Sequence, residues 1–135
     1  MKLWNRLYST VWLAFFACVL ISRWMGSHVG IPVHILLGLV LLVITLANAR
    51  SLAALPVPVR LKRISKVTAG FAIFQALGGL ALGAIAHFVP NLPVVPMVLH
   101  GAHVICALAI LAQASSVATA YDMWEEKEFG SAPSQ

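Results

Sequence analysis

The sequence has few charged residues and very few acidic ones. Only 10% of its 135 residues are charged, and 4 Asp and Glu stand against 9 Lys and Arg. Charged residues make up about a quarter of a typical soluble domain, so the composition excludes an ordinary water-soluble fold. Disordered chains combine low hydrophobicity with high charge, and here 61% of the residues are hydrophobic. The composition therefore predicts one small membrane domain.

Stretches without charge locate the membrane spans. No charged residue lies within 24–49 or within 67–121. A membrane-spanning helix needs about 20 apolar residues, so the first stretch holds one span and the second holds two. A further apolar run near the N-terminus is followed by Arg23-Trp24-Met25, which is a poor cleavage site for a signal peptide. The sequence thus predicts four spans, at about 7–26, 29–49, 67–88 and 94–121.

Basic residues gather between the second and third predicted spans. The segment 50–66 carries Lys and Arg repeatedly, whereas 26–30 and 89–93 carry none. The positive-inside rule places that segment and both termini in the cytoplasm. We therefore expect an all-α, four-helix up-down bundle that crosses the cytoplasmic membrane several times. It comprises residues 1–124 and is followed by a polar tail over 125–135. The basic excess is a topology signal, so no nucleic-acid partner is predicted.

The histidines are the informative polar residues. All of them map to the outer half of the predicted bundle: His28, His34, His87, His100 and His103. Ionisable groups at membrane depth are costly and usually functional. In an up-down ring of four helices, the second and fourth run in the same direction and lie diagonally across the core. At a rise of about 1.5 Å per residue, His34, His100 and His103 lie roughly 7–14 Å below the outer ends of these helices.

Two histidines at matched depth on opposed helices can supply both axial ligands of a haem. His34 is the candidate on the second helix, and either His103 or His100 on the fourth. The apolar run after His103 is similar to the run after His34, which slightly favours His103. The remaining histidine is then available to hydrogen-bond a haem propionate or a quinone.

Small residues and one cation complete the predicted site. Gly38 follows His34 by four residues and Gly79 lies on the third helix, and both would leave room for a flat porphyrin. Close packing of helices is the competing interpretation of such glycines. Arg23 is the one Lys or Arg predicted on the outer side, where it would attract anionic propionates. Its alternative role is that of an interfacial arginine reaching lipid head groups.

Three segments resemble one half of the haem A synthase family over about residues 30–120. They read HILLGLVLLVITLANAR, FAIFQALGGLALGAIA and HGAHVICALAILAQA. That family consists of two fused four-helix halves, each with a His on its second and fourth helix and Gln-x-x-x-Gly on its third. Here Gln75 to Gly79 matches that pattern. The resemblance implies binding of haem b, with haem o or haem a as alternatives, and a homodimer would supply a second haem site.

The chain departs from the catalytic half of that family. The family has a Glu three residues before the helix-2 His and commonly an Arg after it, whereas this chain has Ile31 and Ile35. The family's cysteine pair in the outer loop is also absent. Hydroxylation of a haem methyl group is therefore not expected of this chain.

The sequence favours a b-type cytochrome-like membrane protein that exchanges electrons with quinol or with subunits of a respiratory complex, or that has another redox role related to haem A synthases. A structural or assembly subunit, whose histidines only form hydrogen bonds, is the first alternative. A protein that handles copper or zinc through His100 and His103, with His28 and His87 nearby, is the second.

Overall fold

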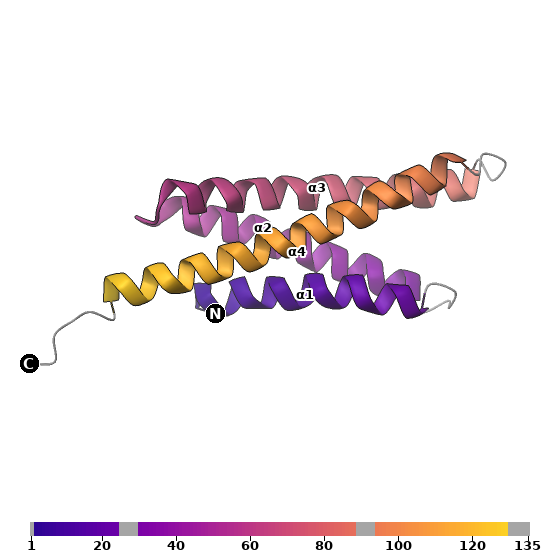
Figure 1. Cartoon of the computed structure of the whole chain (residues 1–135). Coiled ribbons are helices and arrows are strands. Elements are labelled where there is room, and N and C mark those ends of the chain that lie inside the picture. The colour runs from indigo at the N-terminus through magenta and orange to yellow at the C-terminus, as the bar shows by residue number, and fades with distance from the viewer. Residues whose placement is uncertain (1, 25–29, 89–93, 130–135) are drawn as a thin grey trace, which may run out of the picture.

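The computed structural model describes residues 2–24, 30–88 and 94–129, with the side chains of 20–24, 86 and 94–96 left out. Its regular structure over these ranges is helical, as predicted. It consists of α1 (Leu3–Trp24), α2 (Gly30–Ala54), α3 (Val59–Phe88) and α4 (Val94–Phe129) (Figure 1).

The helices run up and down in sequence order (Figure 1). The start of α1, the α2–α3 connection and the end of α4 lie at one end of the bundle, which we call the inner end. The opposite end is called the outer end. Each helix contacts its two neighbours in a closed ring, and over the described residues α2 makes no backbone contact with α4. The prediction that these two helices lie diagonally across the core is confirmed.

Three helical segments are long and apolar enough to cross a membrane: Gly30–Ala54, Val59–Ile85 and Met97–Phe129. Helix α1, predicted as a further span, is not among them over its described residues. Large apolar side chains are exposed on the outside of all four helices, as with Phe15, Leu36, Phe74 and Ile105. A surface of this kind is suited to lipid rather than to water.

The helices extend further than the predicted spans. α2 continues to Ala54, α3 begins at Val59, and α4 continues to Phe129, so the first part of the predicted polar tail is helical. Charge-free stretches mark only the apolar part of a helix, and polar residues continue the same backbone pattern. The Lys62 Nζ donates a hydrogen bond of 3.1 Å to the Ala53 carbonyl oxygen, satisfying an acceptor in the last turn of α2.

The basic segment 50–66 is accordingly mostly helical, with a connection of only 55–58 between α2 and α3. Pro56 and Pro58 lie in that connection, as their restricted backbone requires. Pro32 occupies the first turn of α2, where its missing N–H leaves no helical hydrogen bond unmade.

Positions that face the bundle axis recur at alternating intervals of three and four residues, the spacing of left-handed helix bundles. The series are Leu7, Thr10, Ala14 and Ala17 on α1, Leu52, Asn48, Thr45 and Leu41 on α2, Leu61, Ser65, Thr68 and Ala72 on α3, and Tyr121, Val117, Ala114 and Ile110 on α4. All of these side chains are buried, so each helix turns one continuous stripe toward the others.

These stripes divide the bundle into layers. The inner apolar cluster includes Leu7, Leu52, Val57, Leu61, Val117, Ala118 and Tyr121. The polar layer consists of the buried residues Thr10, Thr45, Asn48, Ser65 and Thr68. The middle apolar cluster comprises Ala14, Leu41, Ala72, Cys106 and Ile110. Beyond it, toward the outer end, the bundle opens into a cavity.

The inner apolar cluster predicts a contrast between two leucines of α2. Leu52 is 0% exposed, whereas Leu46 is 39% exposed on the outside of the bundle. We expect Leu52→Ala to lower the free energy of unfolding by about 2–5 kcal/mol because it leaves a cavity. The matched Leu46→Ala variant removes the same atoms without opening the core and should change stability far less. Unfolding of the full chain in micelles, followed by circular dichroism, measures both, and equal losses would contradict the layer assignment.

Candidate cofactor site

The outer half of the bundle contains a cavity of about 1090 Å³ that is partly open to its surroundings and to which all four helices contribute. Cavities that bind small molecules and cofactors commonly measure about 300–1,000 Å³, so there is room for a large ligand. Four members of the middle apolar cluster line it and form its floor: Ala14, Leu41, Ala72 and Ile110. The wall is mainly apolar, and its nitrogen-bearing side chains are His34, Gln75, His100 and His103.

The rings of His34 and His103, which both line this cavity, lie against each other. Their ring centroids are 5.9 Å apart and their planes are inclined by 63°. One ring comes from α2 and the other from α4, so the pair bridges two helices that make no backbone contact with each other over the described residues. The structure therefore brings these two sequence-predicted histidines together.

Both rings carry an unsatisfied polar atom. The Nδ1 atoms of His34 and His103 are buried, and neither has a hydrogen-bond partner in the described part of the chain. A buried polar atom without a partner costs free energy, so these two nitrogens mark a place where the described residues leave polar groups unsatisfied. Imidazole nitrogens are common metal ligands, so a metal ion bound between two histidines is one partner that could join the pair.

Helix α3 fixes the position of the His103 ring. A Cβ at Gly79 would lie 3.2 Å from His103 Cε1, and one at Gly78 would lie 3.9 Å from its Nδ1. The missing side chains thus let this edge of the ring lie directly against α3, which leaves Nε2 as the nitrogen available to a ligand. Gln75 lies one turn before Gly79 and lines the same cavity with a buried, unpartnered Oε1.

Small residues keep the cavity open on the other walls. A Cβ at Gly38 would meet no atom within 4 Å, so the space beside the His34 helix is unfilled at that position. On α3, the residues facing the cavity include a stripe of small side chains at Ala72, Ala76, Gly79 and Gly83. These positions provide the width that a flat ligand needs between helices.

The other predicted site residues are placed differently. His100 lines the cavity but is exposed, whereas His103 is half-buried. His87 is also exposed, and its ring packs against Phe88 with centroids 4.8 Å apart. Arg23 is in the last turn of α1, but its side chain lies outside the described residues, as does the whole of His28. Within the described residues, no three His, Cys, Asp or Glu side chains group closely enough to hold a metal ion.

Sequence reasoning missed the contribution of α1. Ala14, Ala17 and Cys18 line the cavity, although Arg23 was the one α1 residue assigned to the site. Small residues three and four positions apart on an otherwise bulky helix are the signal that identifies this wall. Cys106 is buried below the cavity with its Sγ 3.6 Å from the Phe71 carbonyl oxygen, in keeping with a packing role.

Comparison with known proteins gives no relative. The chain matches no protein-family model, no curated protein and no solved structure. The resemblance to haem A synthases therefore rests on the quoted motifs alone.

The contact between α3 and His103 predicts different effects at two adjacent glycines. Replacing either by Ala should favour the helix by about 1 kcal/mol through backbone entropy. Gly78→Ala adds an ordinary van der Waals contact, whereas Gly79→Ala presses on the ring and must displace it. We expect the His103 ring signals in NMR spectra to shift strongly only in Gly79→Ala. Equal shifts in the two variants would show that the ring does not lie against Gly79.

Proposed function

We propose that this chain is a membrane protein that binds haem b through His34 and His103 and exchanges electrons with quinol or a respiratory partner. The observation that carries the proposal is the pair of imidazole rings 5.9 Å apart across a mainly apolar cavity. The pair comes from two diagonal helices, so the iron of a haem would be held by one histidine from each of them.

The residues fit that cofactor. An imidazole nitrogen binds its metal at about 2 Å and the ring centre lies about 1 Å further on, so two opposed rings have centroids about 6 Å apart. The observed distance agrees with that value. The two rings, inclined by 63°, would be the nitrogen ligands of the haem iron.

The surrounding residues have distinct proposed roles. Gly38 and Gly79 leave space for the macrocycle, and His100 at the edge of the cavity is placed to hydrogen-bond a propionate or a quinone. Arg23 is retained as a candidate partner of the propionates. Gln75 offers an acceptor for an N–H of the His103 ring, the kind of support that metal-bound histidines usually have.

Electron transfer is favoured over hydroxylation. When bound, haem supplies a reversible one-electron carrier whose potential depends on its axial ligands and burial. The two positions where haem A synthases carry Glu and Arg are Ile31 and Ile35, and both line the cavity. The wall therefore offers no acid at the place where that family needs one for catalysis.

Replacing the histidines separates their roles. The purified wild-type chain should show sharp low-spin haem bands on reduction and a pyridine haemochrome of haem b. Both His34→Ala and His103→Ala should abolish the low-spin bands, because each removes an axial ligand. His100→Ala should keep them, and His87→Ala is the matched control with an exposed histidine.

Other outcomes of the same experiment would contradict the proposal or favour one of the alternative functions. Bands that survive the loss of both His34 and His103 would refute the axial pair. Stoichiometric copper or zinc without iron would indicate a metal-handling protein. Full stability of the triple variant lacking His34, His100 and His103, together with absence of any metal, would indicate a structural or assembly subunit.

We also propose that α1 spans the membrane with α2, α3 and α4, and that the inner end faces the cytoplasm. Helix α1 has 22 residues and exposes Trp12, Phe15 and Phe16 on the outside of the bundle. Arg60, Arg63 and their basic neighbours lie at the inner end, as the positive-inside rule requires of the cytoplasmic side. This arrangement corresponds to a multi-pass protein of the cell membrane.

Reporter fusions test this topology. A green fluorescent protein at the C-terminus should fluoresce and an alkaline phosphatase there should be inactive, because folding of each reporter depends on the compartment. Fusions placed after residue 91, between α3 and α4, should give the reverse pattern. An active phosphatase at the C-terminus would contradict the proposed orientation.

A further inference from the structure

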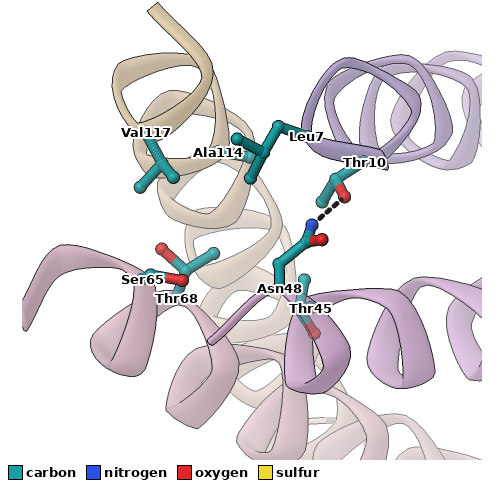
Figure 2. Close-up of a pocket in the computed structure, with 8 residues that line it drawn as sticks. All are labelled: Leu7, Thr10, Thr45, Asn48, Ser65, Thr68, Ala114 and Val117. Carbon is teal, nitrogen blue, oxygen red and sulfur yellow. Dashed lines mark hydrogen bonds between the residues drawn. The ribbon is translucent and has the colours of Figure 1, made fainter. Parts of the chain in front are cut away.

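The polar layer encloses a second, much smaller cavity that the proposed function does not use. Its volume is about 10 Å³, and its apolar wall is Leu7, Ala114 and Val117. The polar wall consists of the whole polar layer, and each of its five side chains is at most 4% exposed. In Figure 2, Asn48 of α2 reaches Thr10 of α1, and Ser65 and Thr68 of α3 face them. The site therefore joins three helices at the bundle axis, with α4 closing it.

The hydrogen bonds of Asn48 leave one strong acceptor unused. Its Nδ2 donates to Thr10 Oγ1 at 2.8 Å, and Thr10 Oγ1 in turn donates to the Arg6 carbonyl oxygen at 2.8 Å. The Oδ1 of Asn48 is buried without a hydrogen-bond partner among the described residues. A buried carbonyl oxygen without a hydrogen-bond partner lowers the stability of the fold, because it has lost its bonds to water.

The threonines cannot satisfy that acceptor. The Thr45 hydroxyl donates to the Leu42 carbonyl oxygen at 2.9 Å. The Thr68 hydroxyl donates to the Ile64 carbonyl oxygen at 2.9 Å and lies 3.1 Å from Gln113 Oε1. Their single hydrogens are thus engaged, while their oxygens can still accept. The cavity consequently has more acceptors than donors, and its occupant must supply hydrogens.

We propose that this cavity binds one ordered water molecule that donates a hydrogen bond to Asn48 Oδ1 and links α2 to α3. A cavity of about 10–15 Å³ on this measure has room for one water, and buried waters commonly make about three hydrogen bonds to otherwise unsatisfied groups. Its second hydrogen is accepted by a threonine oxygen. The Ser65 hydroxyl, which has no hydrogen bond in the described part of the chain, donates to it.

An alkali cation is the other occupant that an acceptor-rich cavity suggests. No carboxylate lines the site, so an ion would bring an uncompensated charge into a buried position. The Arg6 cation also lies on α1 only one turn from Thr10, which adds repulsion. Electrostatics thus favours a neutral molecule.

The first test looks for the water directly. In NMR spectra of the full chain in micelles, the Asn48 side-chain amide hydrogens should show a cross-peak to a long-lived water. Ser65→Ala should remove or strongly weaken it, because that variant deletes the donor on the opposite wall. Ser116→Ala is the matched control, since the Ser116 hydroxyl on exposed α4 surface bonds only its own helix. Absence of the cross-peak in the wild type overturns the proposal.

The second test asks whether Asn48 and Ser65 act through a shared partner. Their side chains make no direct hydrogen bond, so independent residues would lower the melting temperature additively. A bridging water makes the melting-temperature shifts of Asn48→Leu and Ser65→Ala non-additive. The double variant should then melt at nearly the same temperature as the less stable of the two single variants. Additive shifts overturn the proposal, as does a wild-type melting temperature that rises when choline chloride is replaced by sodium or potassium chloride at equal concentration.

Discussion

The alternation of three- and four-residue steps along each helix is the constraint on which the rest of this structure depends. On α4 one series runs from His103 through Ala107 and Ile110 to Ala114, so a cavity-lining histidine and core residues belong to the same stripe. The steps keep that stripe on the bundle axis over its whole length. Cavity, apolar clusters and polar layer are thus successive levels of one packing pattern.

The arrangement of the helices could be predicted from the sequence, but the residues at which they begin and end could not. Charge-free stretches revealed the antiparallel order, and that order placed α2 and α4 on the diagonal. The same stretches missed the first turns of α3, because Arg60 and Lys62 are charged and yet helical. Hydropathy reports which part of a helix is apolar, whereas the backbone follows local hydrogen bonds that charged residues also make.

The inner faces were the hardest feature to predict. Outward residues such as Leu36 are as apolar as the core, so hydropathy does not separate the two sides of α2. Asn48 is not detected by such a count because it is a single polar residue within a charge-free stretch, and Ser65 is not detected because it lies in the basic segment. The preference between His100 and His103 depends on the rotation of α4, which places the His103 ring against Gly79 on another helix.

Under the proposed function, the middle apolar cluster has a consequence for how the site would respond to the membrane potential. It separates the histidine cavity from the polar layer, so a cofactor held above it would lie close to the outer aqueous phase. An electron arriving there from the outer side would cross little of the transmembrane electric field, which acts on charge in proportion to the depth traversed. Under the proposed function, the redox equilibrium of the site would therefore depend only weakly on the membrane voltage.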